Sequence, residues 1–98
     1  MTRRRAFVRL EPTARFRKSY TKLDRRTQDE CDAALHQLLV EPLAADLQLK
    51  PILPTTTYWE ARVNRRDRLI ILPDGTVAHI MDVVTHDEIR RWSRYIPQ

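Results

Sequence analysis

The order of apolar and polar positions predicts a strand and then two helices in the first half of the chain. Residues 6–10 alternate as a short strand does, and Pro12 ends it. Apolar residues then recur at helical spacing, first at Phe16, Tyr20 and Leu23 and next at Cys31, Ala34, Leu35, Leu38 and Leu39. Thr13 and Asp24 precede these stretches as N-cap residues, and Pro42 marks the end of the second. We therefore expect a helical hairpin with one apolar face on each helix.

The period changes to two in the second half, which predicts strands. Residues 57–64 place Trp59, Ala61 and Val63 on one side and Tyr58, Glu60, Arg62 and Asn64 on the other. A turn at residues 65–67 leads into a strongly apolar strand over residues 68–72. A second turn at residues 73–75 leads into a further strand over residues 76–84.

The last predicted element is a short helix. Thr85 and Glu88 have the spacing of a capping box, and Ile89, Trp92 and Ile96 follow at helical spacing. The full order predicts one α+β domain over residues 1–98, with the helical hairpin on one face of an antiparallel meander. Trp59, Ala61 and Val63 should face the hairpin. The opposite face should be open and should carry Tyr58, Glu60, Arg62, Arg68 and the corner at His86.

Charge and composition narrow the class of partner. The 98 residues include 18 Lys and Arg against 13 Asp and Glu, a net charge of +5. This excess favours a polyanionic partner, either nucleic acid or an acidic protein, although a solvated basic surface without a ligand stays open. A second basic surface is predicted at Arg3, Arg4, Arg5, Arg9, Arg15, Arg17, Lys18 and Lys22, where it could follow a nucleic-acid backbone.

Other classes of function find no support in the sequence. Cys31 is the only cysteine, so neither an internal disulfide nor a thiolate zinc site can form. No His, Asp or Glu group has metal-ligand spacing, and Gly75 is the only glycine, so we expect no metal or cofactor. Nothing approaches the ~18 apolar residues of a membrane span, and no signal peptide is recognisable, which leads us to expect a cytoplasmic protein.

Two arginines and a histidine are the main candidates for chemistry. Arg62 and Arg68 belong to neighbouring strands joined by a tight turn, and two guanidinium groups on one side of a sheet suit a bridging phosphate. The alternative is a surface pair of Arg62 with Glu60 and an exposed Arg68. His86 lies at the strand-to-helix corner, where an imidazole could give or take a proton, unless it is a passive exposed residue.

Several segments together resemble the RelE/ParE toxin superfamily. They are residues 58–63, 67–71 and 84–88, a first helix at 16–23 and a second helix ending at Glu41–Pro42. The resemblance extends from Phe7 to about Trp92. It implies the toxin of a type II toxin–antitoxin pair, monomeric when free and bound to a cognate antitoxin in a hetero-oligomer.

The resemblance is greatest to the RNA-cleaving branches, the RelE, YoeB and YafQ types. It implies a metal-independent mRNA endoribonuclease that acts mostly on the ribosome through the ribose 2′-hydroxyl. Arg62 and Arg68 would bind the scissile phosphate, and His86 would act as acid or base. The general base stays open between Glu60 and Asp87.

The sequence departs from these branches at two places. RelE carries lysines near Tyr58 and Glu60, and the YoeB type has a glutamate where the nearest residues here are Gln48, Leu49 and Lys50. For RNA binding we expect Arg65 and Arg66 at the turn, with Tyr58 or Trp92 stacking on a base. The alternatives are a ParE-like inhibitor of DNA gyrase without nuclease activity and an inactive binder with the toxin fold.

Overall fold

The computed structural model describes residues 7–40 and 45–93. Its strands are β1 (Arg9–Pro12), β2 (Lys50–Pro51), β3 (Trp59–Arg62), β4 (Asp67–Asp74) and β5 (Val77–Thr85). Its helices are α1 (Ala14–Thr21), α2 (Arg25–Gln37) and α3 (Ile89–Ser93), with short 3-10 helices η1 (Ala45–Leu47) and η2 (His86–Glu88). The predicted α+β class and the order of its elements are confirmed, and none of the described helices is long and apolar enough to cross a membrane.

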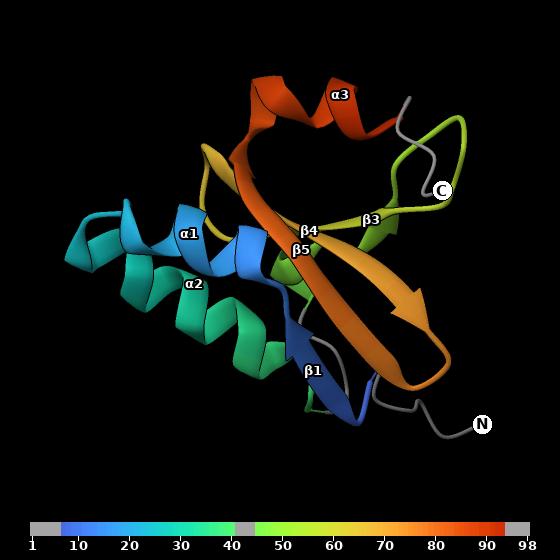
Figure 1. The fold of residues 1–98 in the computed structure, drawn as a ribbon, viewed down its shortest axis with the longest axis horizontal. Coiled ribbons are helices and arrows are strands. Elements are labelled where there is room, and N and C mark those ends of the chain that lie inside the picture. The colour runs from blue at the N-terminus through green and yellow to red at the C-terminus, as the bar shows by residue number, and fades with distance from the viewer. Residues whose placement is uncertain (1–6, 41–44, 94–98) are drawn as a thin grey trace.

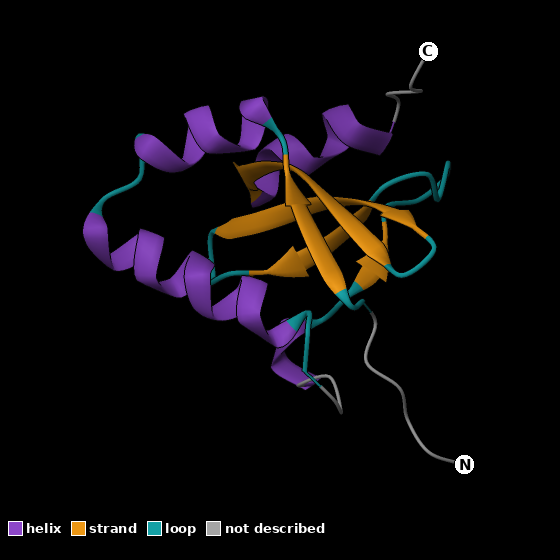
Figure 2. Ribbon diagram, turned by 60° about the horizontal axis from the view of Figure 1, so that its bottom comes forward, coloured by secondary structure: helices purple, strands orange, loops and turns teal. Residues whose placement is uncertain are grey.

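The strands form one twisted sheet in the order β1-β5-β4-β3-β2 (Figures 1 and 2). The β3, β4 and β5 strands make the predicted antiparallel meander. Two features differ from the prediction. The first strand lies at Arg9–Pro12 rather than at residues 6–10 and pairs in parallel with β5. The two-residue strand β2, which no alternation indicates, adds to β3 at the other edge.

The hairpin helices begin where the capping residues predict. The Thr13 hydroxyl accepts a hydrogen bond from the amide of Phe16 at 3.1 Å, and the Asp24 carboxylate accepts one from the amide of Thr27 at 2.8 Å. Hydrogen bonds from Thr27 also lower the pKa of Asp24. The second helix ends at Gln37, before the expected boundary; Glu41 and Pro42 lie outside the described residues.

The main core lies between the hairpin and one face of the sheet (Figure 1). The buried residues of this core are Phe7, Phe16, Cys31, Ala34, Leu38, Leu47, Ala61, Leu69, Ile71, Ala78, Ile80 and Val83. Trp59 and Val63 pack against it, so the predicted inward side of β3 is confirmed. Burial raises the pKa of the Cys31 thiol to about 12.

A second core covers much of the face that was expected to be open. It joins Ile52, Tyr58, Ile70 and Val84 to Ile89 and Trp92 of the terminal helix. The rings of Tyr58 and Trp92 meet edge to face, with centroids 4.8 Å apart. The expectation of an open face is therefore wrong around Tyr58, because α3 folds back over that part of the sheet.

Candidate functional site

A tight turn between β3 and β4 brings the two candidate arginines together. The Asn64 side-chain oxygen accepts hydrogen bonds from the amides of Arg66 at 2.8 Å and Asp67 at 2.7 Å, the pattern of an Asx turn. The amide of Val63 donates to the carbonyl oxygen of Asp67 at 3.0 Å and closes the loop. Arg62 and Arg68 consequently lie directly opposite each other in the sheet, as the sequence predicts.

Arg68 uses its guanidinium group to hold this turn. Its Nη1 donates to the carbonyl oxygens of Asn64 at 2.6 Å and Asp67 at 3.0 Å, and its Nε lies 3.7 Å from a Glu60 carboxylate oxygen. The side chains of Arg68 and Glu60 are only 12% and 11% exposed. The expected alternative of a Glu60–Arg62 pair with an exposed Arg68 is therefore wrong. Glu60 pairs with its diagonal neighbour across the strands instead.

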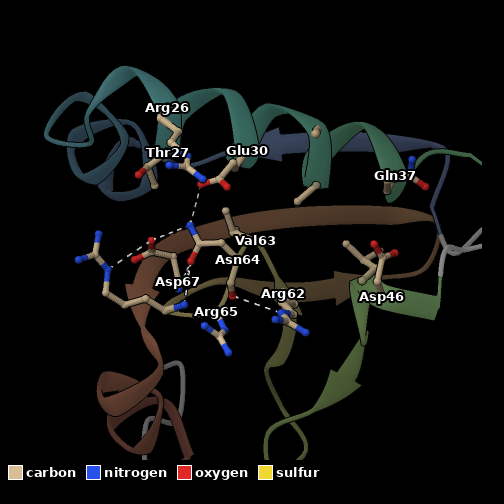
Figure 3. A pocket seen from close by; sticks show the side chains of 14 residues that line it. Arg26, Thr27, Glu30, Gln37, Asp46, Arg62, Val63, Asn64, Arg65 and Asp67 are labelled. Atoms are coloured by element: carbon tan, nitrogen blue, oxygen red, sulfur yellow. Dashed lines mark hydrogen bonds and ion pairs between the residues drawn. The ribbon is translucent and has the colours of Figure 1, made fainter.

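Arg62 remains available for a ligand. It is half-buried, its Nε lies 3.4 Å from the carbonyl oxygen of Asn64, and it joins no ion pair within the described part of the chain. It lines a hollow of about 880 Å³ between α2 and the turn (Figure 3). Three more arginines and three carboxylates line the same hollow: Arg26, Arg65, Arg66, Glu30, Asp46 and Asp67.

The turn also supports the corner at His86. The amide of His86 donates to the carbonyl oxygen of Arg66 at 2.7 Å, which fixes the start of η2 against the turn. One Glu88 carboxylate oxygen accepts from both the amide and the hydroxyl of Thr85, each at 2.9 Å. The predicted capping box is confirmed, and the hydrogen bonds from Thr85 lower the pKa of Glu88.

A second hollow of about 540 Å³ brings three of the candidate catalytic residues together. Glu60, His86 and Asp87 line it, together with Lys50, Ile89 and Arg90. His86 and Asp87 are exposed there, whereas Glu60 is buried. The five candidates are thus divided between two hollows. Arg62 lines the hollow beside α2, whereas Arg68 is enclosed at the turn between the two hollows.

Two cations at this hollow were missed by the sequence analysis. Lys50 lies on β2 directly opposite Glu60, and no pattern predicts a strand of two residues next to prolines. Arg90 lies four residues after His86, and that spacing on a predicted helix could have identified it. Both side chains are exposed, and neither joins an ion pair with another described residue.

The structure corrects the placement of the two candidate stacking residues. Tyr58 is fully buried and Trp92 is 5% exposed, both inside the second core. The Arg15 guanidinium lies 5.1 Å above the Trp92 ring. The expectation that these rings lie on an open surface is wrong, because each one packs against the other. Arg65 and Arg66 are exposed at the turn, as expected for residues that contact an RNA backbone.

Within residues 7–40 and 45–93, no three His, Cys, Asp or Glu side chains are grouped so that they could hold a metal ion. Arg3, Arg4 and Arg5 of the second basic surface lie outside the described residues, but Arg17, Lys18 and Lys22 are exposed as expected.

Comparison with known proteins identifies the fold. No protein-family model and no curated protein matches the chain by sequence. YafQ from E. coli strain BL21(DE3) matches with a TM-score of 0.67 and 18% identity, over 82% of this chain and 94% of YafQ. The E. coli DinJ–YafQ toxin–antitoxin complex contains a match at 0.66 and 17% identity, over 89% and 96%.

A third solved structure has the same fold. The YoeB/ParE toxin from Agrobacterium tumefaciens matches with a TM-score of 0.62 and 17% identity, over 80% of this chain and 98% of that toxin. The chain therefore has the fold of the RelE/ParE toxins, and the resemblance inferred from its sequence is confirmed at the level of the fold.

Proposed function

We propose that this chain is the toxin of a type II toxin–antitoxin pair and cleaves mRNA in the cytoplasm, in association with the ribosome. The observation that carries the proposal is the placement of two side chains on either side of one turn. One is Arg62, which joins no ion pair among the described residues, and the other is His86, which is exposed. Arg62 can offer a guanidinium group to a phosphate at this turn, and His86 can offer a proton donor from the other hollow. The toxin fold supports the same reading.

In the proposed reaction the ribose 2′-oxygen attacks the adjacent phosphorus and the bond to the 5′-oxygen breaks. His86 gives a proton to the departing 5′-oxygen, and a carboxylate takes one from the 2′-hydroxyl. Asp87 suits the second role better than Glu60, since it is exposed and the Glu60 carboxylate faces Arg68. The products are a 2′,3′-cyclic phosphate and a free 5′-hydroxyl.

Positive charge stabilises the phosphorane in this scheme. Arg62 supplies a charge-assisted donor, and Lys50 and Arg90 add cations around the His86 hollow. Arg68 acts mainly through the turn that it holds, because its Nη1 already donates to two carbonyl oxygens.

The enclosure of Arg68 also favours a second candidate function. One of the two expected phosphate ligands is already occupied by the protein's own backbone. A non-nucleolytic role, as a ParE-like gyrase inhibitor or an inactive binder with the toxin fold, needs no phosphate site at this turn. The test must therefore measure both targets.

A cognate antitoxin is the proposed protein partner. The YafQ neighbour forms a toxin–antitoxin complex with DinJ, and the basic surface of this chain suits an acidic segment. The free toxin would be a monomer that becomes part of a hetero-oligomer. Co-expression with an adjacent gene should restore growth and yield a stable complex.

The function is tested by expressing the chain from a tightly controlled promoter, with primer extension on mRNA and plasmid supercoiling measured in parallel. Arg62→Ala should lower cleavage by about 10²–10³-fold, as loss of one transition-state donor does. His86→Gln should lower it by about 10²–10⁴-fold. His36→Gln is the control, because His36 is exposed on α2 and lines neither hollow. Altered supercoiling with intact transcripts would transfer the assignment to gyrase.

A further inference from the structure

The Asn64 side chain uses its whole hydrogen-bonding capacity. Its amide nitrogen donates to the carboxylates of Glu30 and Asp67, each at 3.0 Å, and its oxygen accepts from the amides of Arg66 and Asp67. Glu30 belongs to α2, so one side chain joins the turn to the helical hairpin (Figure 3).

The main-chain oxygen of the same residue is shared by both arginines. It accepts from Arg68 Nη1 at 2.6 Å and lies 3.4 Å from Arg62 Nε. The side-chain contacts of Asn64 fix where this oxygen lies, and the oxygen in turn orients the two guanidinium groups. The arginines therefore depend on a residue that brings no charge of its own to either hollow.

We propose that Asn64 is the positioning residue of the phosphate site and that Glu30 is its anchor on α2. The inference rests on the proposed function for its consequence in catalysis. A turn former alone would need only the contacts to Arg66 and Asp67. The contact to Glu30, 34 residues away, distinguishes the two roles because it ties the arginines to the hairpin.

The chemistry of the amide suggests a sharp set of substitutions. Asn64→Asp keeps the acceptor for the two turn amides but places a carboxylate against Glu30 and Asp67. Glu30→Gln alone keeps an oxygen that accepts from Asn64, so it should behave as the native protein. In the double variant, the glutamine amide introduced at position 30 can donate to the new carboxylate and should restore part of the link.

Arginine NMR signals report the orientation without any assay of activity. A guanidinium group held by hydrogen bonds rotates slowly and gives separate Nη–H signals, whereas a free one gives an averaged signal. Arg68→Lys assigns the signals. We expect separate Arg68 signals in the native protein and in Glu30→Gln, averaging in Asn64→Asp, and partial return in the double variant. Separate signals retained in Asn64→Asp, or no return in the double variant, would overturn the proposal.

Cleavage of a transcript by the same proteins links the orientation to function. Asn64→Asp should cut about 10²-fold more slowly, since small misplacements in a site have effects of this size, and the double variant should recover in part. Full activity with averaged Arg68 signals overturns the positioning role and leaves the proposed function intact. A native protein that cuts no RNA but shows the expected signals overturns the function and keeps the orienting role.

A second substitution covers the case in which Asn64→Asp does not fold. Asn64→Ser retains a short oxygen for the turn amides, but its hydroxyl has one hydrogen and cannot serve both carboxylates. Averaged Arg68 signals are expected in this variant too, and separate signals would overturn the proposal.

Discussion

Two arginines that face each other across a turn have different environments in this protein. The sequence predicts that Arg62 and Arg68 are neighbours, because the number of residues between two alternating strands sets which positions pair. It cannot predict which one is enclosed. That outcome depends on where the turn directs its carbonyl oxygens and on the diagonal contact of Arg68 with Glu60.

The environment of Arg68 makes its side chain important for the stability of the folded protein. Arg68→Ala would leave the buried Glu60 carboxylate without its ion-pair partner and would remove one hydrogen bond each from the carbonyl oxygens of Asn64 and Asp67. The free energy of unfolding should fall by about 1–3 kcal/mol, against about 0.5 kcal/mol or less for Arg62→Ala. Urea denaturation followed by tryptophan fluorescence measures both. Equal losses for the two variants would show that the enclosure of Arg68 adds nothing.

At the scale of elements, local signals predicted most of the fold. Thr13 and Asp24 cap the helices that they were expected to cap, and alternation assigned both sides of β3 correctly. Alternation of apolar and polar residues cannot show which other element covers each side of a strand. The five-residue helix α3 is too short for a strong pattern, and its packing over Tyr58 depends on contacts between distant segments.

The capping contacts at the start of η2 contribute to the free energy of unfolding in a way that depends on pH. The pKa of Glu88 is lowered in the folded protein, because its carboxylate accepts hydrogen bonds from Thr85. The folded state therefore binds this proton less readily than the unfolded state. The contribution is complete above the ordinary pKa of a glutamate and disappears as the pH falls through the lowered value.

Substituting Glu88 isolates that contribution. Glu88→Gln should melt below the native protein at pH 7, and the difference in melting temperature should shrink steadily in acid. Thermal unfolding from pH 7 to pH 3 measures it. Asp87→Asn is the matched control, because Asp87 is exposed in the same 3-10 helix and has no part in the capping contacts. A difference that does not change with pH would contradict the assignment.

At the scale of the whole molecule, acidic side chains of the hairpin are engaged within the protein while several cations are not. Asp24 caps α2, Asp29 pairs with Arg25, and Asp32 accepts a hydrogen bond from Tyr20. Arg17, Lys18 and Lys22 are exposed and join no ion pair among the described residues. Part of the net charge of +5 therefore comes from hairpin cations that have no ion pair among the described residues. They lie in the region that the sequence predicted as a second basic surface.

This surface should add affinity for RNA that depends on salt and not on base sequence. Binding of single-stranded RNA releases about 0.7 counterion for each phosphate neutralised. A plot of the logarithm of affinity against the logarithm of salt concentration therefore has a slope proportional to the number of phosphate contacts. Removing two free cations in Lys18→Gln/Lys22→Gln should reduce that slope by roughly 1.4, twice the value for one contact. Fluorescence anisotropy with a labelled RNA across a salt series measures it.

The matched control removes the same charge from a paired position. Arg25 is paired with Asp29 at 3.2 Å and lies outside the second basic surface, so Arg25→Gln removes the same charge as Lys18→Gln, the single form of the test variant. If specific contacts on the hairpin matter, the control should change the slope less than the test variant does. Equal changes would mean that RNA responds only to net charge, and the hairpin would then have no defined RNA surface. An unchanged slope in both variants would restrict RNA contacts to the turn and the two hollows, where Arg62 and His86 lie.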